Sequence, residues 1–91
     1  MSHEGGSGVR TVVMPPMGDA AGELILAEWF KVVGDPVRKG EPLFAVETDK
    51  TTVTVEALAS GVLSGILVQA GEPATEGQPI AHISVRESGS G

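Results

Sequence analysis

The feature that most constrains the fold of this chain is an internal repeat with a period of 37 residues. Two glycines and two prolines stand at the same places in both copies: Gly34, Pro36, Gly40 and Pro42 in the first, and Gly71, Pro73, Gly77 and Pro79 in the second. Because glycine and proline set the backbone angles of turns, the two copies should form the same turns in the same order. Two such halves are expected to close face to face, as a flattened barrel or sandwich with an approximate two-fold axis.

The segment from residue 23 to 33 (ELILAEWFKVV) is ambiguous by itself, because it is rich in residues that favour a helix. Its counterpart in the second copy contains Gly61 and Gly65, which disfavour a helix. We therefore predict that this segment is extended in both copies. Residues 9–14 form the first predicted strand, which ends at Pro15 because proline cannot donate to a strand ladder. The predicted fold class is all-β.

The core should be built from large apolar side chains on the predicted strands. We expect most of the deeply buried positions to be among seven residues: Ile25, Trp29, Val46, Val55, Val62, Leu67 and Ile83. Phe30 and Phe44 are also expected in the core, rather than in an aromatic platform for stacking a ligand. His82, inside the last predicted strand, is expected on a face of the barrel.

A tight hairpin is predicted around Lys50. Residues 43–46 are apolar, and residues 52–57 alternate Thr or Glu with Val or Ala, which is typical of a strand with one buried face. The residues between these runs suffice only for a short turn, so the Lys50 amine should project into solvent. The simplest explanation of a lysine at this place is that its charge makes the loop tip soluble. The hairpin joins the two halves, and the chain ends near Val9 and Val85 should lie at the opposite edge.

Composition excludes several classes of function. The chain has 91 residues and no cysteine, which excludes disulfides and thiolate metal sites and fits a reducing compartment. A net charge of −6 argues against nucleic acid and anionic membranes as partners. No apolar run approaches the roughly 20 residues that cross a bilayer, and no signal-peptide pattern is present. We expect a soluble, intracellular-type domain over residues 9–86, with flexible Gly/Ser-rich tails at residues 1–8 and 87–91.

No catalytic constellation can be assembled from this sequence. The two histidines, His3 and His82, have no nucleophile or ligand cluster near them in the predicted fold. Residues 18–22 (GDAAG) are glycine-rich but open no predicted helix, so they do not predict a phosphate site. One exposed amine on a rigid turn remains. A module of this kind is suited to carrying a group covalently.

Several separated motifs in residues 9–85 resemble those of lipoyl domains, the swinging-arm carriers of 2-oxo-acid dehydrogenase complexes. The run Glu47-Thr48-Asp49-Lys50-Thr51 resembles the lipoylation motif of that family, in which alanine often stands at the place of Thr51. MPPMG at residues 14–18 and GDPVRKGEPL at residues 34–43 also resemble it. So does a glycine placed eleven residues after the lysine.

The resemblance implies a barrel-sandwich hybrid of two four-stranded antiparallel sheets. It also implies that Lys50, flanked by Asp49 and Thr51, bears lipoate in amide linkage and carries acyl groups and reducing equivalents between active sites. The domain would be a non-catalytic part of a dihydrolipoamide acyltransferase component, monomeric when isolated. It would be cytoplasmic in a bacterium, or in the mitochondrial matrix of a eukaryote.

The implied partners are a lipoate ligase or lipoyl transferase, a thiamine-dependent 2-oxo-acid dehydrogenase, an acyltransferase catalytic domain and dihydrolipoamide dehydrogenase. Glu47, Asp49 and the loop at residues 17–22 are candidates for contact with these partners, although they are also ordinary residues of solvated turns.

Three alternatives stay open at this point. A biotin carrier domain has the same architecture, but its lysine is typically flanked by methionines. The glycine-cleavage carrier protein is longer and has a helical end. A structural or ligand-binding barrel without any modification would leave the lysine incidental.

Overall fold

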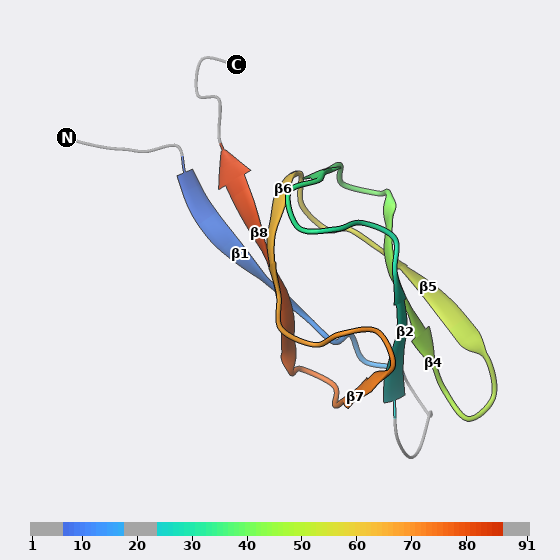
Figure 1. Ribbon diagram of the computed structural model, residues 1–91. Coiled ribbons are helices and arrows are strands. Elements are labelled where there is room, and N and C mark those ends of the chain that lie inside the picture. Colours follow the sequence, from blue (N-terminus) through green and yellow to red (C-terminus); the bar gives the residue numbers. More distant parts are fainter. Residues whose placement is uncertain (1–6, 18–23, 87–91) are drawn as a thin grey trace.

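The computed structural model describes residues 7–17 and 24–86, and within them the chain forms eight strands and no helix (Figure 1). The strands are β1 (Ser7–Val13), β2 (Leu24–Trp29), β3 (Pro36–Val37), β4 (Pro42–Glu47), β5 (Thr52–Glu56), β6 (Gly61–Ile66), β7 (Glu72–Ala74) and β8 (Pro79–Arg86). They pair antiparallel in two four-stranded sheets, with the orders β1-β8-β6-β3 and β5-β4-β2-β7. The all-β prediction is confirmed. The segment predicted as extended, residues 23–33, is a strand over Leu24–Trp29 only, because the chain turns at residues 32–35, where the Asp35 N–H donates to the Val32 carbonyl. Residue 23 lies outside the described residues. No helix in the described ranges is long and apolar enough to span a membrane.

The predicted repeat is present in the backbone. A shift of 37 residues carries β2, β3 and β4 onto β6, β7 and β8, and the paired strands take equivalent places in the two sheets. The fourth places are taken by β1 and β5, which the shift does not relate. Even the irregularities recur, because the β2–β4 ladder has a bulge between Leu26 and Glu28 and the β6–β8 ladder has one between Leu63 and Gly65. The four turn glycines have positive φ in both copies: Gly34 (101°), Gly40 (92°), Gly71 (92°) and Gly77 (83°). These angles are costly for residues with a Cβ, which explains why glycine is repeated there.

The two halves are tied together by reciprocal hydrogen bonds. The Gly34 N–H donates to the Leu63 carbonyl at 2.8 Å, and the equivalent Gly71 N–H donates to the Leu26 carbonyl at 2.7 Å. Each turn of one half therefore satisfies a carbonyl beside the bulge in the other half. Because a buried or strand-edge carbonyl without a partner is costly, neither half can satisfy its own backbone alone.

The core lies between the sheets, and its largest fully buried side chains come from both halves. They are Phe44, Met14, Leu26, Leu43, Leu63, Ile80, Ile83 and Val46. Trp29 packs against this cluster, with its ring centroid 5.2 Å from that of Phe44, and its Nε1–H donates to the Val68 carbonyl at 2.9 Å. Phe44 is thus in the core as predicted, whereas Phe30 is 42% exposed, which corrects its predicted place.

The predicted core was only partly right. Val46 and Ile83 are fully buried, and Ile25, Trp29 and Val55 are partly buried. Val62 and Leu67 are 41% and 51% exposed, and the buried positions are their neighbours Leu63 and Val68.

The bulges decide which residues of β2 and β6 share a face. In a regular strand Leu26 and Trp29 face opposite sides, because side chains alternate with a period of two. The bulge inserts one residue between them, so that both face the core. Leu63 and Ile66 have the same relation in β6. Ile25 and Trp29 were predicted to share a face, as uninterrupted alternation requires, but the bulge leaves Trp29 and not Ile25 on the face of Leu26. Val62 and Leu67 were each placed one residue too early, which is an error of phase in the second copy.

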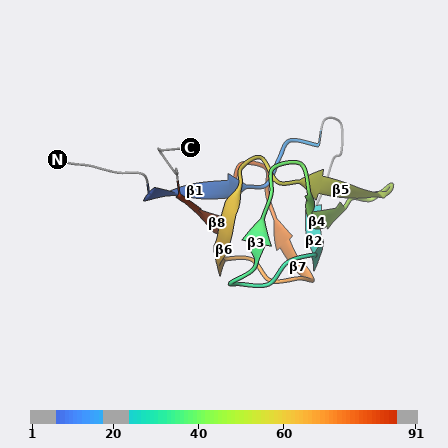
Figure 2. The ribbon, with the colours of Figure 1, turned by 90° about the horizontal axis from the view of Figure 1, so that it is seen from above.

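The outer ends of β1 and β8 lie on one side of the barrel, and the β4–β5 hairpin lies on the other (Figures 1 and 2). This confirms the predicted separation of the chain ends from the hairpin. β1 begins at Ser7, two residues before the predicted start. The remaining residues of both predicted tails, 1–6 and 87–91, lie outside the described residues, as does most of the predicted loop at residues 17–22.

Candidate functional site

The predicted hairpin is formed by β4 and β5, whose last ladder pair is Glu47 with Thr52. Residues 48–51 form its tip, closed by a hydrogen bond of 2.7 Å from the Thr48 N–H to the Thr51 carbonyl. The tip thus brings together the three residues predicted as the site, Asp49, Lys50 and Thr51, and all three side chains are exposed.

The backbone of the tip is held by one side chain. The Thr48 hydroxyl accepts hydrogen bonds from the Lys50 N–H at 3.1 Å and the Thr51 N–H at 3.0 Å, and it donates to the Thr51 carbonyl at 3.0 Å. Thr48 was included in the sequence motif but was assigned no role. The available signal was a two-residue loop without glycine, preceded by a residue whose side chain can bond to nearby backbone.

The Lys50 amine is exposed, and it makes no ion pair or hydrogen bond with another residue within ranges 7–17 and 24–86. Its surroundings at the tip are acidic, because Glu47 and Asp49 are both exposed beside it. Nothing in the described part of the tip competes for the amine, so a large partner can approach it directly.

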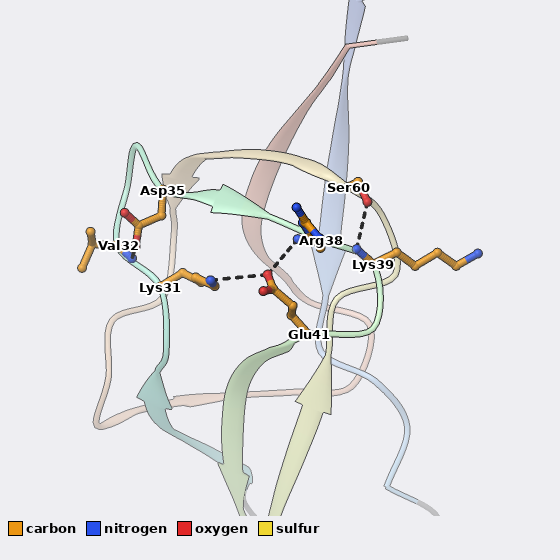
Figure 3. Close-up of polar contacts among 7 residues, drawn as sticks. All are labelled: Lys31, Val32, Asp35, Arg38, Lys39, Glu41 and Ser60. Carbon is orange, nitrogen blue, oxygen red and sulfur yellow. Dashed lines mark hydrogen bonds and ion pairs between the residues drawn. The ribbon is translucent and has the colours of Figure 1, made fainter. Parts of the chain in front are cut away.

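The two other lysines lie at the opposite end of β4 (Figure 3). Lys31 is partly buried, and its Nζ is 3.3 Å from Glu41 Oε1. Lys39 is exposed, but the backbone of its turn is fixed to the β5–β6 connection, where its N–H donates to Ser60 Oγ at 2.9 Å. Exposure alone therefore does not distinguish Lys50 from Lys39. What distinguishes Lys50 is its place at the tip of a projecting hairpin.

Glu41 organises this second region. Its Oε1 accepts the Arg38 N–H at 2.9 Å. That backbone hydrogen bond, together with the Lys31 ammonium, holds the pKa of the Glu41 carboxyl below its ordinary value. In the other half, Gln78 Oε1 accepts the Thr75 N–H at the same distance. The turn geometry is therefore repeated, but only the first half places a carboxylate at the capping position, because Gln78 stands at the place of Glu41.

His82 lies on β8, between β1 and β6. Its ring is partly buried, and Nδ1 has no hydrogen-bond partner within the described ranges. Residues 7–17 and 24–86 contain no group of three or more His, Cys, Asp or Glu side chains that could hold a metal ion. His3 lies outside the described residues.

Comparison with known proteins agrees with this geometry. Residues 10–83 match the model of the biotin/lipoyl family, described as "Biotin-requiring enzyme". The chain is 41% identical over 70 residues to the dihydrolipoyllysine-residue succinyltransferase component of the 2-oxoglutarate dehydrogenase complex of Staphylococcus saprophyticus, a match that covers 77% of this chain and 16% of the relative. It is 39% identical over 72 residues to the dihydrolipoyllysine-residue acetyltransferase component of the acetoin cleaving system of Bacillus subtilis, covering 79% of this chain and 18% of the relative.

A plant protein gives a similar match. The acetyltransferase component 5 of the chloroplastic pyruvate dehydrogenase complex of Arabidopsis thaliana is 34% identical over 79 residues, covering 87% of this chain and 17% of the relative. The chain thus spans less than a fifth of the length of each of these three relatives.

Proposed function

Because this chain belongs to the biotin/lipoyl attachment family, as a lipoyl domain, we propose that Lys50 is its attachment residue and carries lipoate in amide linkage. One observation carries the proposal: the Lys50 amine stands exposed at the tip of a hairpin whose backbone is ordered by hydrogen bonds. The residues present fit a covalently attached arm, because the Lys50 side chain is exposed and its amine is the acyl acceptor that an amide linkage requires.

The chain supplies the acyl acceptor, and the modifying enzyme must supply the rest. A lysine amine in water carries a proton at neutral pH, so the enzyme must first remove that proton. The Lys50 nitrogen then forms a bond to the acyl carbon of an activated lipoyl donor, and the bond from that carbon to its leaving group breaks. The product amide is neutral, which changes the formal net charge of the chain from −6 to −7.

The attached group would supply a dithiolane that can be reductively acylated, deacylated and reoxidised, which is chemistry of the cofactor. The protein holds the base of the arm on a projecting turn, away from the core and from the outer ends of β1 and β8 (Figure 2). A tether to the rest of a longer chain would then keep the arm at high effective concentration near the active sites it serves.

The proposed partners follow from the relatives, which are acyltransferase components of complexes that process 2-oxo acids or acetoin. We propose that this domain delivers acyl groups within a 2-oxo-acid dehydrogenase complex, between its thiamine-dependent dehydrogenase and its acyltransferase catalytic domain. Dihydrolipoamide dehydrogenase would reoxidise the arm, and a lipoate ligase or lipoyl transferase would install it. The relatives include both succinyl- and acetyltransferases, so the proposal names this class of complex and no single 2-oxo acid.

Biotin is the alternative cofactor within the same family. Lipoate is favoured for two reasons. The relatives are named as dihydrolipoyllysine-residue acyltransferases. In addition, Asp49 and Thr51 flank Lys50, whereas methionines typically flank the lysine of a biotin carrier domain.

Intact-mass measurement after co-expression with a lipoate ligase tests the proposal, with a biotin ligase in a parallel culture. The chain should gain the mass of one lipoyl group and no biotin. Lys50→Arg should abolish the gain, because a guanidinium is not a usable acyl acceptor here. Lys39→Arg is the matched control, since Lys39 is also exposed in a turn, and it should leave the gain intact. Incorporation that survives in Lys50→Arg, or that is lost in Lys39→Arg, would refute the assignment.

A further inference from the structure

We propose that Thr48 is the positioning residue of the modification site, whose hydroxyl fixes the turn so that a ligase meets Lys50 in one orientation. This inference rests on the proposed function of Lys50 and adds a residue that presents the amine without itself reacting. It follows from a conflict between turn chemistry and the need for a lysine at the tip.

The conflict arises because two-residue hairpin loops favour glycine, asparagine or aspartate, which tolerate positive φ. The four turns of the repeat each use a glycine with positive φ, but there is no glycine between Gly40 and Gly61. At the tip the second loop position is Lys50, a residue without that conformational freedom. The backbone must therefore be stabilised in some other way if the amine is to stay in a fixed place.

Thr48 provides that stabilisation through three contacts. Its hydroxyl accepts the N–H of Lys50 and of Thr51, and it donates to the Thr51 carbonyl, at 3.0 to 3.1 Å. Two of the contacts fix the peptide groups on either side of the Lys50 Cα. The direction in which the Lys50 side chain leaves the backbone is thereby determined, although the side chain itself is exposed.

The repeat does not account for this threonine. Side chains cap the other turns in the opposite direction: Asp35 and Glu41 each accept the N–H of the residue three positions earlier (Figure 3). Glu72 and Gln78 do the same in the second half. Thr48 instead accepts from residues two and three positions later, and a shift of 37 residues places it on Val85, near the end of β8. The device is therefore specific to the hairpin that carries Lys50.

Loss of the hydroxyl should act locally. Residues 48–51 lie beyond the last ladder pair of the hairpin, and the core cluster contains none of them. Thr48→Val keeps the shape of the side chain but removes all three hydrogen bonds, and Thr48→Ser restores the hydroxyl. Thr52→Val is the matched control, because Thr52 is a nearby exposed threonine on β5 whose hydroxyl makes no hydrogen bond to other described residues.

Three measurements on each variant separate positioning from exposure and from folding. The first is kcat/KM for modification by a purified lipoate ligase, followed by intact mass. The second is amide hydrogen exchange at Lys50 and Thr51. The third is acetylation of Lys50 by an N-hydroxysuccinimide ester, which reports only whether the amine is accessible. Thermal denaturation confirms that every variant is folded.

For Thr48→Val we expect kcat/KM to fall by roughly tenfold or more, since small misplacement of a reacting group is costly. The Lys50 and Thr51 amides should exchange faster, while chemical acetylation stays at the rate of the unchanged chain. Thr48→Ser and Thr52→Val should match the unchanged chain in all three measurements.

Two results would overturn this inference without affecting the proposed function. One is modification of Thr48→Val at the normal rate, and the other is a kcat/KM for Thr48→Ser as low as that for Thr48→Val. A loss in Thr52→Val equal to that in Thr48→Val would do the same, because any change on the hairpin would then suffice. Failure of the unchanged chain to be modified at Lys50 would overturn the proposed function and this inference with it.

Discussion

Replacing Gly61 with alanine should destabilise the domain although it adds only one methyl group. Gly61 begins β6, and a Cβ built on it would overlap the Ser84 carbonyl oxygen and lie 2.9 Å from Ile83 Cγ2. Ser84 and Ile83 belong to β8, which is hydrogen-bonded to β1 on one side and β6 on the other. The strand therefore cannot withdraw without lengthening hydrogen bonds in one of the two ladders. This is a structural reason for the glycine that stands eleven residues after Lys50.

The expected cost follows from two opposing effects. Overpacking lowers the free energy of unfolding by roughly 1–3 kcal/mol. Alanine has less conformational freedom than glycine in the unfolded chain, which raises the free energy of unfolding by about 0.4–1 kcal/mol. We expect a net loss of about 1–2 kcal/mol, which for a domain of this size lowers Tm by roughly 4–16 °C. Urea and thermal denaturation can be followed by the fluorescence of Trp29, the only tryptophan of the chain, which packs against Phe44.

Gly65→Ala is the matched control on the same strand. Its Cβ would meet only His82 Cδ2, at 3.7 Å, an ordinary contact distance, so its stability should equal or slightly exceed that of the unchanged chain. A Gly61→Ala variant as stable as Gly65→Ala would show that β8 moves freely, and the reasoning from the crowded β6–β8 contact would be wrong.

Two further predictions test the core and the acid response. Leu63→Ala should cost roughly 2–5 kcal/mol and Val62→Ala well under half as much, because Leu63 is fully buried and Val62 is 41% exposed; the reverse ranking in urea denaturation would restore uninterrupted alternation along β6. Because folding lowers the pKa of Glu41 from its ordinary value of 4.5, the stability that this carboxylate contributes is present above that pH and is lost as the pH falls below it, through the pKa of the folded state. Glu41→Gln should keep the turn, as Gln78 does in the other half. Between neutral pH and the acid range in which Glu41 is protonated, this variant should lose less stability than the unchanged chain. Identical pH profiles of the urea midpoint for the two proteins would contradict this.

The candidate site was largely predictable because its determinants are local. A run of alternating residues, a short turn and a second run of apolar residues suffice to place Lys50 at a hairpin tip, whatever surrounds the hairpin. The repeated glycines and prolines likewise fix the turns of both halves, because each acts on its own backbone angles. That was enough to predict the all-β class, the pairing of two similar halves and the place of Lys50 at an exposed hairpin tip.

Tertiary structure decided what depends on the neighbouring strand. Whether Leu26 and Trp29 share a face is set by a bulge, and a bulge exists only in a ladder between two strands. The same holds for Gly61, whose lack of a side chain matters only because β8 lies against it, while its counterpart Leu24 at the start of β2 is buried in the core. For Thr48 the sequence offers only a residue type that can bond to nearby backbone. Its three contacts exist only once residues 48–51 have closed into a turn. Contacts between residues distant in sequence, or oriented by a turn already formed, have no signature in composition or periodicity.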